Sequence, residues 1–225
     1  KVKQGEVAPE VFTPGREGSF RTDILAASRR HGRLAVPVTG LEPLLQEVAA
    51  GHPVLVFQNL GLEWWPRWHF AVVVGYDLPR GRVVLHTGRE RAREVALETF
   101  ERTWDRGGSW ALVILSPEEL PAASGPLPAL QAALGLERTE RYGAAARAYS
   151  AITRRWPRRL GGWMGLGNVH FRQGNLDGAL HAFQGALRNR PRSPEAWNNL
   201  AVVLAERGRI PAARTAALTA VRLAG

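Results

Sequence analysis

Residues 53–88 read PVLVFQNLGLEWWPRWHFAVVVGYDLPRGRVVLHTG, and this stretch decides the fold of the first half of the chain. Three short apolar runs lie within it, at 54–57, 70–76 and 82–85. Each run is rich in β-branched residues and is bounded by Gly, Pro or Asn, a pattern that is typical of β-strands. Residues 77–81 (DLPRG) have the composition of a short hairpin turn. The sequence therefore predicts three consecutive strands of an antiparallel sheet.

One polar residue interrupts this apolar background: His69, at the start of the middle strand. A histidine beside Trp64, Trp65 and Trp68 can be held in one tautomer and kept partly dry, which suits a general base. The other interpretation is a histidine at the rim of the sheet whose hydrogen bond goes to a backbone carbonyl. The residues alone favour this second interpretation.

The segment 68–77 (WHFAVVVGYD), followed by a turn and by a strand that ends in residues 86–88 (HTG), resembles the histidine-containing half of the bacteriocin-processing, double-glycine cysteine peptidases. The match spans roughly residues 7–121. It implies a papain-like α+β domain with an antiparallel sheet. Three upstream segments also occur in the order that the family shows, namely 14–20 (PGREGSF), 24–32 (ILAASRRHG) and 53–61 (PVLVFQNLG).

The resemblance implies that His69 is the base of a papain-like site. The family places an Asp after the following strand, and Thr87 or His86 occupies that position here. Thr87 can orient the ring through its hydroxyl, more weakly than a carboxylate would. Gln58 and Asn59 end the preceding strand and can meet His69 across the sheet, or else serve the turn that follows them.

The chain contains no cysteine, so it offers no disulfide, no thiolate metal ligand and no thiol nucleophile. In the resembled family the nucleophile precedes every segment matched here, and it would therefore fall before Lys1. A trimmed enzyme, a clipped protein and a peptidase-like domain that performs no chemistry all fit this expectation. The chain as it stands is expected not to hydrolyse peptides. The resemblance also favours an envelope-associated or periplasmic location in a bacterium.

The remainder of the first half has an α+β order, with helices first and most of the sheet later. Residues 116–128 hold four prolines and a glycine, which cannot continue a helix or a central strand. We therefore expect a first domain at 1–118, a linker at 119–128 and a second domain at 129–225. Periodicity and capping residues predict three helices and two further strands, at 19–30, 41–50, 95–104, 34–38 and 110–115.

Beyond the linker the sequence repeats with a period of 34 residues. Trp163 and Trp197 are one period apart, and Ala145, Ala179 and Ala213 follow the same interval. This period, with large residues on the first helix and small ones where helices cross closely, is that of tetratricopeptide (TPR) repeats. The sequence predicts an all-α TPR superhelix of three repeats, at roughly 127–160, 161–194 and 195–225.

The first helix of each repeat lines a concave groove in such arrays, and we expect a protein or peptide partner to bind there. Asn168 and Asn199 match two asparagines of the carboxylate clamp of some chaperone-binding repeats, with Met164 in place of the expected lysine. Helix packing is the other interpretation of both asparagines. The residues expected on or near this face are Asn168, Phe171, Arg172, Asn198, Asn199 and Glu206.

The formal net charge of +10 lies in the C-terminal part of the chain. Residues 121–225 contain 15 arginines and 5 acidic residues, whereas residues 1–120 are balanced. A basic domain can attract an acidic protein, an anionic lipid or a nucleic acid. Nucleic acid is not expected, because the patches of interleaved Lys and aromatic residues that bind it are absent from the sequence. No apolar run reaches the roughly 18 residues of a membrane span, and no metal or other cofactor is expected.

Two functions follow from these patterns. The first is a cysteine-peptidase-like domain fused to a TPR module that recruits a partner. The second is a non-catalytic scaffold in which both domains bind. The final predicted helix, roughly 211–224, carries apolar residues such as Leu218 and Val221 that no following repeat covers, so self-association through it or coverage of this face by a partner is expected. Close packing of its alanines on the preceding helix is the alternative.

Overall fold

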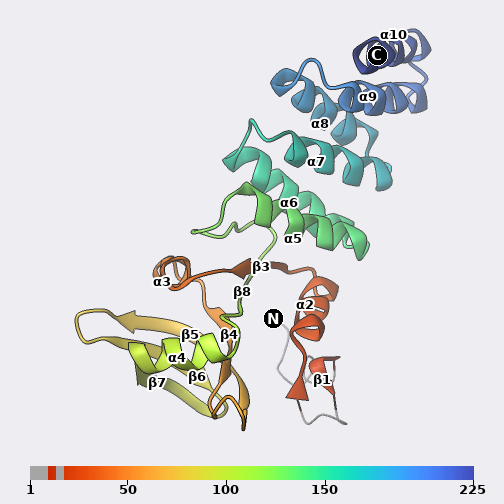
Figure 1. Ribbon diagram of the computed structural model, residues 1–225. Coiled ribbons are helices and arrows are strands. Elements are labelled where there is room, and N and C mark those ends of the chain that lie inside the picture. Colours follow the sequence, from red (N-terminus) through yellow and green to blue (C-terminus); the bar gives the residue numbers. More distant parts are fainter. Residues whose placement is uncertain (1–9, 14–17) are drawn as a thin grey trace. The chain divides into compact units, whose positions relative to one another are not determined.

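The structure, a computed structural model, describes residues 10–13 and 18–225 of the chain. The described chain divides into two compact units, the first formed mainly by residues 33–116 and the second mainly by residues 130–225 (Figure 1). Part of the predicted segment 14–20 lies outside the described residues.

An antiparallel sheet of six strands forms the centre of the first unit, in the order β3-β8-β4-β5-β6-β7 (Figure 1). Val36, Val54, Val56 and Val73 have no exposed surface and form part of the core on one face of this sheet. The predicted α+β order with an antiparallel sheet is therefore confirmed. The strands are β1 (Phe12–Thr13) and β2 (Gly18–Ser19), which pair separately, and β3 (Leu34–Val38), β4 (Val54–Asn59), β5 (Trp68–Asp77), β6 (Arg82–Thr87), β7 (Glu90–Ala96) and β8 (Ala111–Leu115).

The three strands predicted from residues 53–88 are confirmed, and each is longer than the sequence pattern indicates. Strand β4 continues through Gln58 and Asn59, because these residues pair with His69 and Trp68 at the start of β5. The predicted turn between β5 and β6 is also confirmed. Gly81 completes this turn with a left-handed φ of 62°, which a residue without a Cβ adopts freely.

Strand β7 is not predicted from the sequence, since its residues (ERAREVA) are mostly charged and exposed. As the last strand of the sheet it pairs on one side with β6, so it needs no alternation of apolar side chains. Its presence shifts the predicted helix at 95–104 to Leu97–Arg106. Val95 pairs with Val83 of β6, and the helix begins at Leu97 instead.

Helices support the sheet of the first unit. Helix α4 packs against β4, β6 and β7, and the rings of its buried Phe100 and Trp104 stack at 5.8 Å. Helix α3 packs against β4 and β5 and carries a fully buried carboxylate, Glu47. Glu47 accepts a hydrogen bond from the N–H of Ala123 at 2.8 Å and lies 2.8 Å from His52 Nδ1. The helices are α2 (Arg21–Arg30), α3 (Leu41–Ala49) and α4 (Leu97–Arg106).

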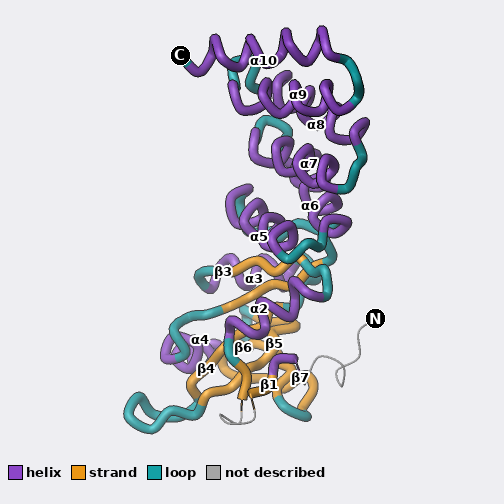
Figure 2. Tube along the Cα trace, turned by 90° about the vertical axis from the view of Figure 1, so that its right-hand side faces the viewer, coloured by secondary structure: helices purple, strands orange, loops and turns teal. Residues whose placement is uncertain are grey.

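Six helices form three successive pairs in the second unit, and they stack in chain order (Figures 1 and 2). The predicted all-α fold of this region is therefore confirmed. The first helix begins at Pro126, inside the predicted linker, because proline fits the first turn of a helix. The helices are α5 (Pro126–Arg138), α6 (Tyr142–Arg155), α7 (Leu160–Arg172), α8 (Leu176–Asn189), α9 (Pro194–Glu206) and α10 (Ile210–Ala224).

The repeat period is visible in individual contacts. The indole N–H of Trp163 donates to the carbonyl of Pro157 at 2.7 Å, and the indole of Trp197 makes the equivalent bond to Pro191 at 2.8 Å. These bonds fix the starts of α7 and α9 on the turns before them. No helix within the described residues is both long and apolar enough to cross a membrane.

Glycines let the helices of the second unit approach closely. A Cβ on Gly165 would overlap the ring of Tyr149, and a Cβ on Gly185 would overlap the ring of Trp163. Ala145 and the equivalent Ala179 are fully buried. Small residues therefore lie where the helices cross, as the sequence pattern predicts.

Candidate functional sites

The first unit contains a small cavity of about 120 Å³ at one end of the sheet. Its lining comes from β4, β5, β6 and β7 and from α4, and it includes Gln58, His69, Thr87, Arg93 and Thr103. Four strands and a helix thus bring together residues that are up to 45 positions apart in sequence. Three of the residues that the peptidase resemblance singles out are among them.

His69 is half-buried on β5, and its Nε2 lies 2.5 Å from the hydroxyl oxygen of Thr87 on β6. Burial lowers the pKa of His69 below its ordinary 6.5, and the positive charge of Arg93 lowers it further. Both effects favour the neutral imidazole at physiological pH. A hydroxyl partner orients this ring but does not stabilise an imidazolium as a carboxylate does.

The two residues expected at the third position of the site lie on opposite faces of β6. Thr87 faces the cavity, whereas the neighbouring His86 is exposed and its Nδ1 accepts a hydrogen bond from the N–H of Ala92 at 3.1 Å. Successive side chains of a strand point to opposite faces, so only one of this pair can meet His69. The structure brings Thr87 to His69 and does not bring His86 there.

Gln58 and Asn59 separate in the same way. Gln58 is buried, lines the cavity and donates from Nε2 to the hydroxyl of Thr103 at 2.7 Å. The side-chain oxygen of Asn59 instead accepts from the backbone N–H groups of Gly61 and Arg67, both at 2.9 Å. Gln58 is therefore placed beside His69, and Asn59 holds the loop that follows β4.

The expectation that tryptophans shield His69 is wrong. Trp68 stacks on Phe57 at 5.2 Å, and both residues alternate with the cavity-facing His69 and Gln58 along their strands. Alternation along the strand thus turns its indole away from the cavity. Trp64 and Trp65 belong to the loop between β4 and β5 and are 79% and 69% exposed.

A groove in the second unit encloses a cavity of about 730 Å³. Its lining comes mainly from the first helix of each pair, with Glu137 on α5, Asn168, Phe171 and Arg172 on α7, and Asn199 on α9. Four of the six residues predicted for the partner-binding face therefore line one cavity. The other two, Asn198 and Glu206, are exposed on α9 but are not among its lining residues.

Within this groove Asn199 Nδ2 donates to Asn168 Oδ1 at 3.2 Å. An asparagine side chain has two N–H donors and one oxygen acceptor, so this single bond leaves hydrogen-bonding capacity on both residues. Met164, at the position of the clamp lysine, packs against the hydrophobic core of the repeats. The pair therefore lacks a cation from that position, and the positive charge of the groove lining comes from the exposed Arg172.

Glu137, which also lines the groove, is held by a hydrogen bond. It accepts from the hydroxyl of the buried Tyr149 at 3.1 Å. Burial, followed by the charge of Glu137 and this bond, raises the pKa of Tyr149 well above its ordinary value of 10.0. The tyrosine therefore stays a neutral donor that fixes the Glu137 carboxylate in the wall.

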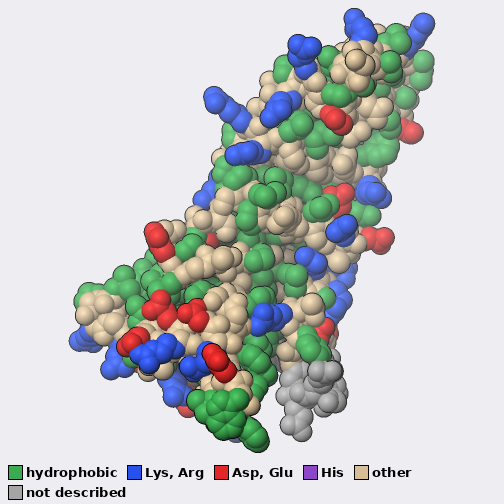
Figure 3. All heavy atoms as spheres, in the orientation of Figure 1, with side chains coloured by type: hydrophobic (Ala, Val, Ile, Leu, Met, Phe, Trp, Pro, Cys, Tyr) green, Lys and Arg blue, Asp and Glu red, His purple; other side chains and the backbone are tan. Residues whose placement is uncertain are grey.

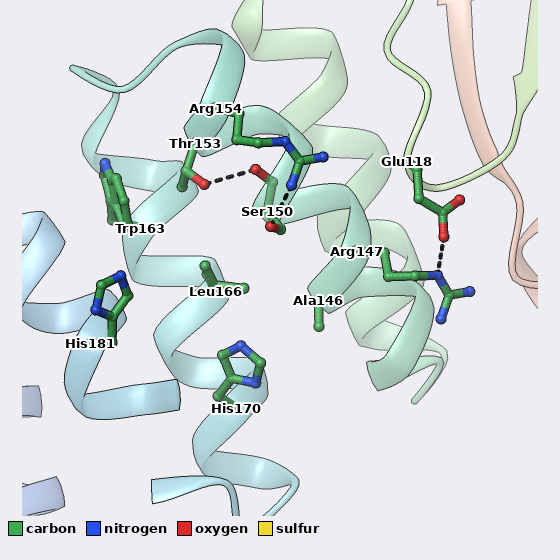
Figure 4. Close-up of a pocket in the computed structure, with 10 residues that line it drawn as sticks. All are labelled: Glu118, Ala146, Arg147, Ser150, Thr153, Arg154, Trp163, Leu166, His170 and His181. Atoms are coloured by element: carbon green, nitrogen blue, oxygen red, sulfur yellow. Dashed lines mark hydrogen bonds and ion pairs between the residues drawn. The ribbon is translucent and has the colours of Figure 1, made fainter. Parts of the chain in front are cut away.

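A second cavity of the repeats, of about 540 Å³, lies between α6, α7 and α8 (Figure 4). Arg147 is ion-paired with Glu118 at its edge, and Arg154 donates to Ser150 at 2.9 Å. Its opposite wall holds His181, whose ring meets that of Trp163 edge to face.

The sequence analysis missed this second cavity. A signal was present, because Arg147 and His181 are 34 residues apart and thus occupy equivalent positions of successive repeats. His170 lies at the lower end of the cavity in Figure 4, and burial lowers its pKa below 6.5. Within the described residues no group of three His, Asp or Glu side chains is arranged to hold a metal ion.

Comparison with known proteins identifies the repeats. The comparison with curated proteins gave no match. Among solved structures, the type III secretion translocator chaperone SycD of Yersinia enterocolitica is similar, with 19% identity, 42% of this chain and 72% of that chain covered, and a TM-score of 0.41. A SycD structure with a peptide of the translocator YopD has the same identity and coverage and a TM-score of 0.42. A MamA structure (AMB-1) has 22% identity, 45% and 56% coverage and a TM-score of 0.42.

The family model "Tetratricopeptide repeat" matches residues 130–186 and 165–225. These two matches together span the helices from α5 to α10, apart from the first residues of α5. The papain-like identity of the first unit stays a prediction. The C-terminal region of this chain consists of tetratricopeptide repeats.

Proposed function

We propose that the chain is a scaffold whose TPR repeats bind a protein or peptide partner in the groove lined by α5, α7 and α9. The carrying observation is the meeting of Asn168 and Asn199, from successive repeats, in a cavity that also holds Phe171 and Arg172. Asparagine side chains can donate to and accept from the backbone of an extended peptide. Phe171 offers apolar contact, and Arg172 offers a charge-assisted bond to a carboxylate.

The partner of this proposal is an acidic segment. Arg172 lies in the groove, and residues 121–225 carry 15 arginines against 5 acidic residues. A surface of one sign attracts and orients a partner of the opposite sign, and it disfavours basic competitors. Glu137 keeps its negative charge while it accepts from Tyr149, so the attraction for an acidic segment comes from Arg172 together with the arginine excess of the repeats around the groove.

Selection of random displayed peptides on the full chain tests this function. Peptides rich in Asp and Glu are expected from the wild type, and Arg172→Glu is expected to abolish their enrichment. Arg188→Glu is the matched control, because Arg188 is an exposed arginine on α8 that does not line the groove. If Arg172→Glu leaves the enrichment of acidic peptides unchanged, or if Arg188→Glu abolishes it equally, the peptides do not bind in the proposed groove.

The two-domain organisation, with domains at 1–118 and 129–225 joined at 119–128, is part of the same proposal. It is supported by the division of the described chain into two compact units. A fragment of residues 117–225 is expected to give a helical circular dichroism spectrum and a cooperative thermal transition. It begins at residue 117 so as to retain the ion pair of Glu118 with Arg147. A disordered spectrum would show that the repeats need the first domain.

A papain-like site around His69 is the second candidate function, and the bond of His69 to Thr87 beside Gln58 favours it. The thiol would have to come from outside residues 1–225, since these contain no cysteine. The gene sequence upstream of Lys1 tests this candidate. A Cys-Gly pair at the start of a predicted helix, preceded by Gln, is expected, and its absence would leave the scaffold alone.

A further inference from the structure

The loop between β4 and β5 displays large apolar side chains to solvent. Leu60 is 48% exposed, Leu62 55%, Trp64 79% and Trp65 69%, and Trp68 at the start of β5 is 56% exposed. Single exposed apolar residues are ordinary on a protein surface, but five within nine positions form a contiguous patch. A patch of this kind marks a surface that contacts something else.

This loop is held in place by hydrogen bonds from its base. Asn59, which is buried, binds both ends of the loop through its side-chain oxygen, and its Nδ2 donates to the carbonyl of Leu62 at 3.3 Å. The N–H of Leu60 donates to the carbonyl of Arg67 at 2.9 Å. A Cβ on Gly61 would overlap the carbonyl of Trp65, so the loop is closely packed against itself. The fold thus presents the indoles on an ordered support.

Arginines lie at the same end of the sheet as this loop. Arg67 belongs to the loop. Arg89 lies in the turn between β6 and β7, and Arg91 lies at the start of β7. This turn is at the same end of the sheet as the start of β5, because Thr87 pairs with Ala71. All three arginines are exposed. Glu63 and Glu90 are also exposed there, which leaves a positive balance. Hydrophobic side chains gather at this end of β4 and β5, next to Lys or Arg side chains (Figure 3).

We propose that the loop at residues 60–67 is an interfacial membrane anchor that inserts into the headgroup region of an anionic bilayer. Tryptophan favours this region, because its ring is apolar while its indole N–H still reaches water or headgroups. The leucines Leu60 and Leu62 add apolar area that can enter the acyl boundary. Arg67, Arg89 and Arg91 can pair with lipid phosphates.

Charge complementarity selects lipid over a protein partner. Exposed indoles next to three exposed arginines match a surface that is apolar within and anionic at its rim, as an anionic bilayer is. A bilayer also requires no shaped complement to the loop, whereas a protein groove does. This inference concerns the first unit and is independent of the partner groove of the repeats.

Flotation of the full chain with lipid vesicles tests the anchor. The wild type is expected to float with vesicles of phosphatidylcholine and phosphatidylglycerol, and less with phosphatidylcholine alone. Trp64→Ser with Trp65→Ser is expected to weaken binding about tenfold or more, because two inserted indoles are lost. Leu78→Ser is the matched control, since Leu78 is 50% exposed in the turn at the far end of β5, and it should float like the wild type.

A second variant separates charge from apolar insertion and does not disturb the loop. Arg89→Gln with Arg91→Gln is expected to remove the preference for anionic vesicles while the residual binding to phosphatidylcholine persists. A wild type that stays with neither kind of vesicle would overturn the proposal, as would an indole variant that floats like the wild type. If the wild type is a dimer that does not float with vesicles, and the Trp64→Ser, Trp65→Ser variant is a monomer, then the loop forms a protein contact and the lipid proposal is wrong.

Discussion

Asn199 donates a side-chain hydrogen bond to Asn168 at 3.2 Å, from the first helix of the third repeat to the first helix of the second. The two residues are 31 positions apart, so they do not occupy equivalent positions of the repeat. The contact between α7 and α9 at the groove therefore joins two different positions of the repeat. The bond joins two repeats within the groove in which we propose that a partner binds.

Asn168→Ala is expected to weaken the acidic peptides selected on the wild type about five- to tenfold, which corresponds to roughly 1 kcal/mol for one hydrogen-bonding group. Isothermal titration calorimetry with one selected peptide measures this change. Asn198→Ala is the matched control, because Asn198 is exposed on α9 outside the groove lining, and its affinity should equal that of the wild type. Equal weakening in both variants would place the peptide elsewhere.

Gly185→Ala is expected to lower the free energy of unfolding of the repeats by about 1–3 kcal/mol, because the added Cβ overlaps the ring of Trp163. Chemical denaturation followed by circular dichroism measures the loss. Gly143→Ala is the control, since its Cβ would meet only Arg147 Nη1 at 3.7 Å. That variant should be neutral or slightly more stable, because alanine favours a helix. A Gly185→Ala protein as stable as the wild type would show that the Trp163 ring can move aside.

The spacing of apolar and small residues predicted the strands of residues 53–88 and the repeat helices, because burial of one face requires such residues at regular positions. Strands with one face in the core must carry apolar residues such as Val54 and Val56, and close helix crossings require small residues such as Ala145. The edge strand β7 buries no such face, and its charged sequence therefore gives no signal. The 34-residue period is enough to place the repeat helices along the chain. The cavity between α6, α7 and α8 is lined partly by exposed side chains such as Arg147, and the period does not determine these.

The site around His69 was predictable in composition but not in orientation. Adjacent residues such as Thr87 and His86 cannot be told apart until the register of β5 and β6 assigns them to faces. The same alternation turned Trp68 away from His69. The burial of Glu47 was missed for another reason. One partner is the backbone N–H of Ala123, 76 residues away, and the other is His52, which lies after helix α3. Neither contact can be recognised from the residue pattern of the helix.

Glu47→Ala is expected to lower the stability of the first unit by about 3 kcal/mol, because it removes a buried group and leaves the N–H of Ala123 without that acceptor. Glu42→Ala on the same helix is the control. Glu42 is exposed and accepts from Gln46, so its loss should cost about 0.5 kcal/mol or less. Thermal unfolding of the two variants against the wild type distinguishes them, and similar melting temperatures would contradict the buried role of Glu47.

The pKa of His69 lies below its ordinary 6.5, because burial and then Arg93 disfavour the imidazolium. The unfolded chain therefore takes up a proton at higher pH than the folded chain does. This linkage stabilises the folded state above pH 6.5, and the contribution is lost as the pH falls through the folded pKa. His69→Gln is expected to lose less stability than the wild type between about pH 7.5 and about pH 5.

Urea unfolding at several pH values measures this difference for His69. The wild type, unfolded in urea at the same pH values, is the reference for this slope. Some dependence should persist in His69→Gln, since burial also lowers the pKa of His170. An unchanged slope in His69→Gln would show that the proton equilibrium of this ring does not differ between folded and unfolded states.

Helix α10 places its alanines inward and its larger apolar residues outward. Ala216 and Ala220 are buried, whereas Leu218 is 55% and Val221 70% exposed. We expect the 225-residue chain to self-associate through this face, because joining two copies removes both side chains from water. Leu218→Glu with Val221→Glu should shift the chain to monomer in sedimentation velocity, whereas the control Gln184→Glu adds charge at an exposed position of α8 and should not. A wild type that is already monomeric at high concentration would show that the alanine packing alone satisfies this helix.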